Sequence, residues 1–106
     1  MEIPNGAGLV EISPWYNEKT VPRELQAPSS LPAETWGRVV VESGMLELAM
    51  RGESPVQAKP DQPVVIPPGT LFQVLKPVAA VRFHIHYFHT PRVTNADNLA
   101  AMISRS

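Results

Sequence analysis

The chain has 106 residues, with 9 Lys and Arg against 10 Asp and Glu, and no cysteine. This length allows one domain with one core, and the balanced, scattered charge gives no basis for binding nucleic acid or an anionic membrane. The missing thiols exclude disulfides and cysteine nucleophiles.

The apolar stretches and the N-terminus also bear on location. The longest apolar stretches are about five residues, far below the roughly 20 that span a bilayer. The first residues, Met-Glu-Ile-Pro-Asn-Gly, lack the basic and apolar blocks of a signal peptide. We therefore expect a cytoplasmic protein with neither a membrane nor a nucleic acid as its partner.

Proline dominates the pattern along the chain, with 12 residues spread from Pro4 to Pro91. Proline ends helices and is excluded from central strand positions, so this spread favours short strands joined by turns over a helical bundle. Residues 1–24 form an irregular arm in which Leu9–Ile12 is a candidate edge strand. Residues 28–35 are predicted to be a loop.

A β pattern begins at Trp36–Glu42, which is rich in aromatic and β-branched residues. After the turn signal Ser43-Gly44, apolar residues alternate with others along Met45–Arg51. Two such segments around a Ser-Gly pair predict a hairpin. Further along the chain, the predicted strands are Val64–Ile66, Leu71–Leu75 and Val78–Phe88.

The last segment changes character after Pro91. Thr94 or Asn95 can cap a helix, and apolar residues then follow at helical spacing, so a short helix is predicted over residues 94–104. Several short strands with turns between them indicate an all-β sandwich or closed barrel, which hides its strand edges. The barrel itself is assigned to residues 25–90, within a single domain of 106 residues.

Two blocks carry a resemblance to a known family over roughly residues 20–90. The first is Thr-Trp-Gly-Arg-Val-Val-Val-Glu-Ser-Gly-Met-Leu at 35–46, and the second is Val-Ile-Pro-Pro-Gly at 65–69 with the later Val-Arg-Phe and Tyr-Phe pairs. In these the chain resembles the small cupin-like family that includes the N-terminal domain of the tellurite-resistance protein B type. The resemblance implies a double-stranded β-helix, or jelly-roll barrel, and a homodimer.

The same resemblance implies a metal site, but with a changed set of ligands. The family usually has a histidine about seven residues before the tryptophan, where this chain has Ser29, and another after the Pro-Gly, where it has Phe72. A glutamate that often precedes the closing Phe-Tyr pair is replaced by His86. The resemblance therefore implies the fold while most of the usual metal ligands are missing.

All three histidines lie in the segment 84–89. On a strand, His84 and His86 project from one face, and two adjacent imidazoles can chelate a transition metal such as Zn, Ni, Fe or Cu. The alternatives are a solvated strand face and a pocket for an organic ligand, since a metal site needs a third and usually a fourth ligand. His89 is expected at the surface.

Three other residues are candidates for lining a ligand pocket. Trp36 is either a core anchor, the favoured interpretation, or part of a pocket wall. Arg38 faces solvent, pairs with a carboxylate or clamps a ligand carboxylate. Phe72, at a position where relatives have a histidine, would make the interior apolar and favour either a filled core or a small organic ligand.

Three functions follow as alternatives. The first is a small-molecule-binding or stress-response module, related to tellurite resistance, without the usual cupin metal. The second is a metal-binding cupin using His84 and His86, with or without enzymatic activity. The third is a structural or interaction domain with a filled barrel. The fold alone does not choose among them.

Overall fold

The computed structural model describes residues 2–51, 54–75 and 80–90. These residues form short strands and a single turn of helix. In chain order the elements are β1 Gly8–Ile12, β2 Tyr16–Asn17, α1 Arg23–Gln26, β3 Ser29–Ser30, β4 Thr35–Ser43, β5 Leu46–Met50, β6 Val56–Ala58, β7 Val64–Ile66, β8 Leu71–Val74 and β9 Arg82–His89.

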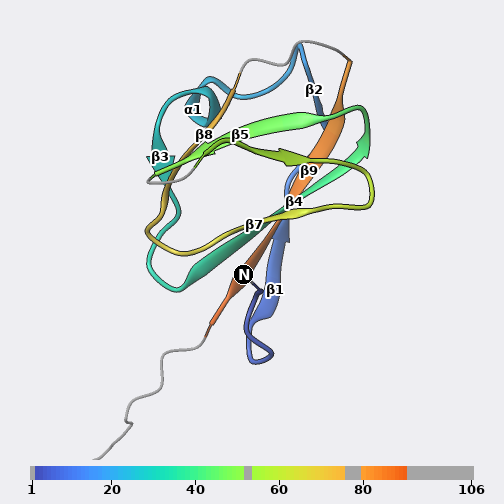
Figure 1. Cartoon of the computed structure of the whole chain (residues 1–106). Helices are drawn as coiled ribbons and strands as arrows, with labels where there is room; N and C mark the ends of the chain where they lie inside the picture. Colours follow the sequence, from blue (N-terminus) through green and yellow to red (C-terminus); the bar gives the residue numbers. More distant parts are fainter. Residues whose placement is uncertain (1, 52–53, 76–79, 91–106) are drawn as a thin grey trace, which may run out of the picture.

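The strands make two antiparallel sheets that face each other (Figure 1). Sheet A has the order β1-β9-β4-β7, with β2 also paired to β9, and sheet B has the order β3-β8-β5-β6. The long pairing of β4 with β9 forms the middle of sheet A. The predicted all-β, jelly-roll barrel is confirmed by this arrangement.

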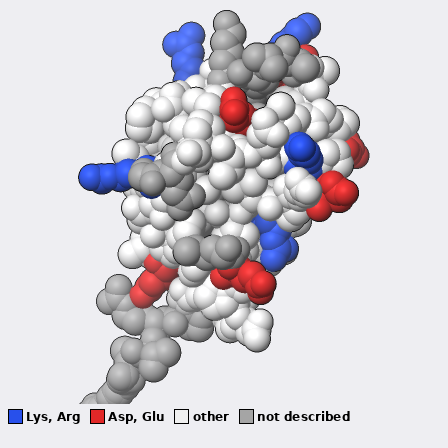
Figure 2. Space-filling model, in the orientation of Figure 1, with Lys and Arg blue, Asp and Glu red and all other residues white. Residues whose placement is uncertain are grey.

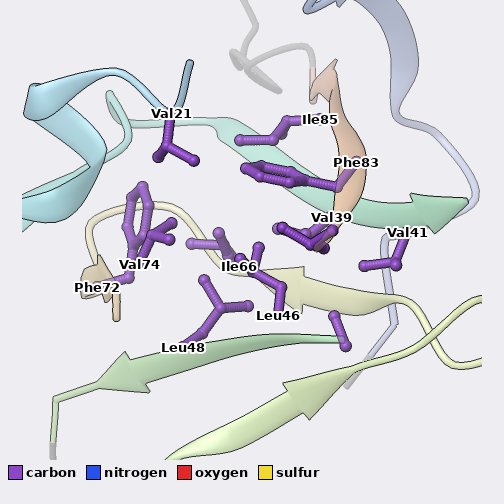
Figure 3. Packing of buried hydrophobic residues seen from close by; sticks show 12 residues of the cluster. Val21, Val39, Val41, Leu46, Leu48, Ile66, Phe72, Val74, Phe83 and Ile85 are labelled. Atoms are coloured by element: carbon purple, nitrogen blue, oxygen red, sulfur yellow. The ribbon is translucent and has the colours of Figure 1, made fainter. Parts of the chain in front are cut away.

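The core fills the space between the sheets because alternate residues of each strand point inward. In β4 the side chains of Val39 and Val41 are buried. In the neighbouring strand β9 their register partners, Ile85 and Phe83, are buried beside them on the same side of sheet A. Figure 3 shows these side chains from sheet A directed towards those of sheet B. The buried hydrophobic residues are Val21, Val39, Val41, Leu46, Leu48, Ala58, Ile66, Phe72, Val74, Val81, Phe83 and Ile85.

The predicted hairpin between β4 and β5 is wrong. Strand β4 pairs with β7 and β9, whereas β5 pairs with β6 and β8, so the chain crosses from sheet A to sheet B at Ser43-Gly44. Val41 and Leu46, on either side of this crossing, are both buried in the common core. Gly44 has φ +80, and a Cβ there would overlap the carbonyl oxygen of Ala80. Glycine therefore allows the chain to cross between the sheets while its backbone lies close to Ala80, just before β9.

The N-terminal arm is more ordered than its sequence pattern indicates. The predicted edge strand is present as β1, and both β1 and β2 pair with β9. Val21 then contributes to the core just before α1, which was not predicted. The predicted loop 28–35 contains the short strand β3.

Two further sequence-based expectations concern a C-terminal helix and membrane-spanning segments. The helix predicted over residues 94–104 lies outside the described residues. Within the described ranges, no helix has the length and apolar character needed to cross a membrane.

Charged residues are dispersed over the face of the molecule that Figure 2 shows. On the face shown in Figure 2, the Lys and Arg side chains stand singly among Asp and Glu, without a large area of one sign. This agrees with the scattered pattern of charges along the sequence.

Candidate functional site

The two positions at which the resemblance implies metal-binding histidines in the barrel interior do not suit a metal in this chain. Ser29 on β3 and Phe72 on β8 are direct partners across the register, so the two positions lie side by side. The Phe72 side chain is 3% exposed and forms part of the core, while the Ser29 hydroxyl donates to the carbonyl oxygens of Glu24 and Ala27. A phenyl ring offers no ligand atom, so the family's interior metal scheme does not fit these residues.

His84 and His86 lie on the opposite, outer face of sheet A. Their neighbours Phe83 and Ile85 point into the core, so alternation along β9 directs both imidazoles away from the barrel interior. The two Nε2 atoms are 3.0 Å apart. The sequence-based placement of both histidines on one face is confirmed, and that face is not the barrel interior.

Trp15 covers one side of this histidine pair. Its ring stacks on His84 with centroids 3.8 Å apart and planes 7° from parallel. The His86 ring meets His84 edge-on, with centroids 4.5 Å apart and planes at 64°. Together these contacts define the plane of the His84 ring.

Burial lowers the pKa of His84, because covering the ring disfavours its charged form. The nearby His86 and Arg82 lower it further, while Glu42 acts in the opposite direction. The shift favours the neutral form of the imidazole, which is the form that ligates metals or accepts a hydrogen bond.

Two arginines flank the histidine pair, and each rests on an aromatic ring. The Arg82 guanidinium lies 4.5 Å from the Trp15 ring centroid and forms an ion pair with Glu42 at 2.5 Å. Arg38 lies 5.0 Å from the Phe88 ring centroid. Arg38 therefore occupies the outer face of sheet A, at a distance from the barrel interior.

Trp36 also lies on this outer face, directly opposite Phe88 in the register. It is only partly buried and is not among the buried core residues. The favoured interpretation of Trp36 as a core anchor is therefore wrong. The reason is that Gly37, its neighbour in β4, occupies the inward position against Ile66 and Ile85.

Ser13 fastens the segment that carries Trp15. Its hydroxyl accepts the Ile85 N–H at 2.8 Å, and its own N–H donates to the Ile85 carbonyl at 2.9 Å. The residue is buried, and it continues the pairing with β9 between β1 and β2. This double contact places Trp15 beside the middle of β9.

A cavity of about 480 Å³ lies at one end of the barrel. Three inward-facing residues lie at the ends of their strands here, Met50 at the end of β5 and Val56 and Val64 at the starts of β6 and β7. They are assigned to the inner face because the residue opposite each of them in the neighbouring strand is buried. These partners are Phe72, Leu48 and Val39, respectively. We call this space the end cavity. Its lining consists of Met50, Arg51, Val56, Pro63, Val64, Val65, Pro67 and Thr70.

A smaller cavity of about 230 Å³ adjoins the end cavity, since Met50 and Arg51 line both. Phe72 lines this smaller space. Of the three pocket candidates from the sequence, the structure therefore brings Phe72 near Arg51, while Trp36 and Arg38 lie together on the outer face of sheet A.

Sequence reasoning missed Arg51 and Trp15. Arg51 follows a predicted strand directly, but nothing local indicates that β6 and β7 come beside it. Trp15 lies in the irregular arm, and its stacking partner His84 is distant along the chain. In the described residues, no group of three or more His, Asp or Glu side chains is placed to hold a metal.

Comparison with solved structures gives the same fold at low sequence identity. A protein from E. coli (strain K12) has a TM-score of 0.78 and 17% identity, over 87% of this chain and 99% of that one. TehB from Haemophilus influenzae has a TM-score of 0.74 and 15% identity, over 81% of this chain but only 32% of TehB. The chain therefore spans about a third of the length of TehB.

No curated protein matched the chain. A family model described as the TehB-like domain matches residues 12–85. That segment runs from the end of β1 to the middle of β9, and it includes all of sheet B, most of sheet A and the end cavity. Because it covers more than half of the sequence, the chain belongs to the TehB-like domain family.

Proposed function

We propose that this chain is a binding module for a small organic anion, with the end cavity as its binding site. The observation that carries the proposal is a hollow of ligand size at the end of an otherwise filled barrel, with an arginine in its wall. A volume of about 480 Å³ falls within the range of small-molecule sites.

The lining supports a ligand with an apolar body and one negative group. Met50, Val56 and Val64 are apolar lining residues, and Thr70 and Arg51 are the lining residues with polar side chains. A guanidinium matches the two oxygens of a carboxylate, so a small carboxylate suits this wall. Among the described residues, no carboxylate forms an ion pair with Arg51.

The filled interior supports binding without the usual cupin metal. Phe72 closes the position that the family gives to a histidine, which leaves the end cavity as the space for a ligand. Membership of the TehB-like family supports a role in a stress response related to tellurite resistance. An inorganic oxyanion would use Arg51 but not the apolar wall, so it makes a useful comparison with a carboxylate.

The test is an NMR titration of the ¹⁵N-labelled chain with acetate, benzoate, tellurite and sulfate. We expect benzoate to shift the amide signals of Val64, Val65 and Thr70 at lower concentration than acetate does. Arg51→Gln should weaken benzoate binding roughly tenfold, which corresponds to about 1.4 kcal/mol. Arg23→Gln, on the exposed helix α1, is the matched control and should leave binding unchanged.

Three results would contradict the proposal. The first is the absence of any shift with all four anions, and the second is equal benzoate affinity in the Arg51→Gln and wild-type proteins. The third is binding of tellurite or sulfate without benzoate, which would show that the apolar wall takes no part.

A further inference from the structure

We propose that His84 and His86 form half of a zinc site, completed by the same two histidines of a second copy of this chain. The inference concerns the outer face of sheet A, and it is independent of the anion proposed for the end cavity. It also differs from the cupin interior scheme, because these imidazoles point away from the barrel core.

The separation of the two ring nitrogens fits two ligands of one ion. Two nitrogens bound to tetrahedral zinc at about 2.0–2.1 Å are about 3.3 Å apart. The observed distance between Nε2 of His84 and Nε2 of His86 is 3.0 Å. The observed distance between the two nitrogens is therefore close to that expected for two ligands of one ion.

The contacts around the rings favour this bidentate arrangement. Trp15 stacks flat against His84 and restrains its plane, while His86 stands nearly perpendicular to that ring. These contacts hold the two rings in positions that suit the binding of one ion.

One chain supplies too few ligands for a closed site. Structural zinc sites have four protein ligands, and the described residues contain no cluster of three or more His, Asp or Glu side chains that could hold a metal. A second copy related by a two-fold axis supplies the same two imidazoles again, which completes a tetrahedral set. The incomplete ligand set is the reason for proposing a second copy rather than another partner.

The surroundings of the histidine pair suit such a contact. Leu9 and Ile12 lie on the same face, opposite Phe88 and His86 in the register. Their side chains are 51% and 49% exposed, and Trp15 is 39% exposed. Exposed apolar side chains gathered in one region are typical of a protein–protein contact. A two-fold contact through the histidines would cover them in both copies.

The two nearby cations do not prevent zinc binding. Arg82 is neutralised by Glu42 and rests on Trp15, and Arg38 rests on Phe88. Both guanidinium groups therefore have other contacts than the imidazole nitrogens.

The experiment measures the mass of the full chain in solution by size-exclusion chromatography with light scattering. The protein must carry no histidine tag, and it is compared in EDTA and with half an equivalent of zinc chloride. We expect a monomer in EDTA and a doubling of mass with zinc, at one zinc for two chains by calorimetry. Cobalt in place of zinc should give the visible absorption of a tetrahedral nitrogen site.

The variants separate the metal site from the contact around it. His84→Ala and His86→Ala should each abolish the doubling, whereas His89→Ala, on the same strand, should retain it. Leu9→Glu should also abolish the doubling by burying a charge, yet leave weak zinc binding to the single pair. Thermal melts in EDTA identify any variant that has failed to fold.

Four results would overturn the inference. No zinc binding would show that the two rings are joined only by a hydrogen bond. One zinc for each chain without a change in mass would exclude the second copy. A dimer in EDTA with no response to zinc would exclude the metal. A zinc-dependent dimer that survives the combined His84→Ala and His86→Ala changes would place the metal elsewhere.

Discussion

Ser13 links the N-terminal strands to the middle of the molecule, and its replacement tests that link. The hydroxyl accepts the buried N–H of Ile85 at 2.8 Å. Ser13→Ala removes this acceptor from a buried site, since Ser13 is only 6% exposed. A buried donor without a partner costs about 1–3 kcal/mol. The volume lost is one oxygen atom, so cavity formation adds little.

The size of the expected effect can be checked by thermal and urea unfolding. For a domain near 100 residues, about 2 kcal/mol corresponds to a melting temperature lower by roughly 8–16 °C. Ser43→Ala, at an exposed position of β4, is the control and should change the free energy of unfolding by less than about 0.5 kcal/mol.

Amide hydrogen exchange gives the residue-specific measurement. The Ile85 amide should exchange faster in Ser13→Ala than in the wild type, because its acceptor is gone, while the Val39 amide on the neighbouring strand should keep more of its protection. Equal melting temperatures for the two serine variants, together with unchanged exchange at Ile85, would refute the reasoning.

Three further predictions concern the crossover, the start of β9 and the core. Gly44→Ala should lower the free energy of unfolding by more than about 2 kcal/mol in urea denaturation, because φ is +80 and the Cβ would overlap Ala80. Hydrogen bonds from its own backbone N–H and from that of Val81 lower the pKa of Glu18. Its charged form therefore stabilises the fold above its unfolded pKa, and this contribution is lost as the pH falls through the folded pKa. Glu18→Gln should give a flatter decline in stability between about pH 5 and pH 3, measured by urea denaturation. Leu48→Ala, at a fully buried position, should cost about 2–5 kcal/mol, also measured by urea denaturation.

Much of the barrel could be predicted because strand signals are local. Strand β7 lies where the sequence predicts it, since three β-branched residues are followed at once by two prolines. The inward rows of β4 and β9 follow from alternation, which also placed His84 and His86 on a shared face. These features depend on neighbouring residues and on steric preferences of the backbone.

The pairing of strands could not be predicted in the same way. The Ser43-Gly44 turn is compatible with a hairpin and with a crossover, and only the burial of Val41 and Leu46 between two sheets decides between them. Burial depends on contacts from residues that are distant in the sequence. For that reason the hairpin was predicted wrongly although both of its strands were found.

The candidate sites also show which features are local to the sequence and which depend on tertiary packing. The sequence by itself determined that two imidazoles project together from one strand, that Phe72 stands where relatives have a histidine, and that no thiol takes part. The tertiary structure alone decided that the histidines face outward under Trp15, and that Arg51 borders a cavity between β5, β6 and β7. The physical reason is that alternation assigns a side chain to a face, whereas the packing of the whole chain decides which face is buried.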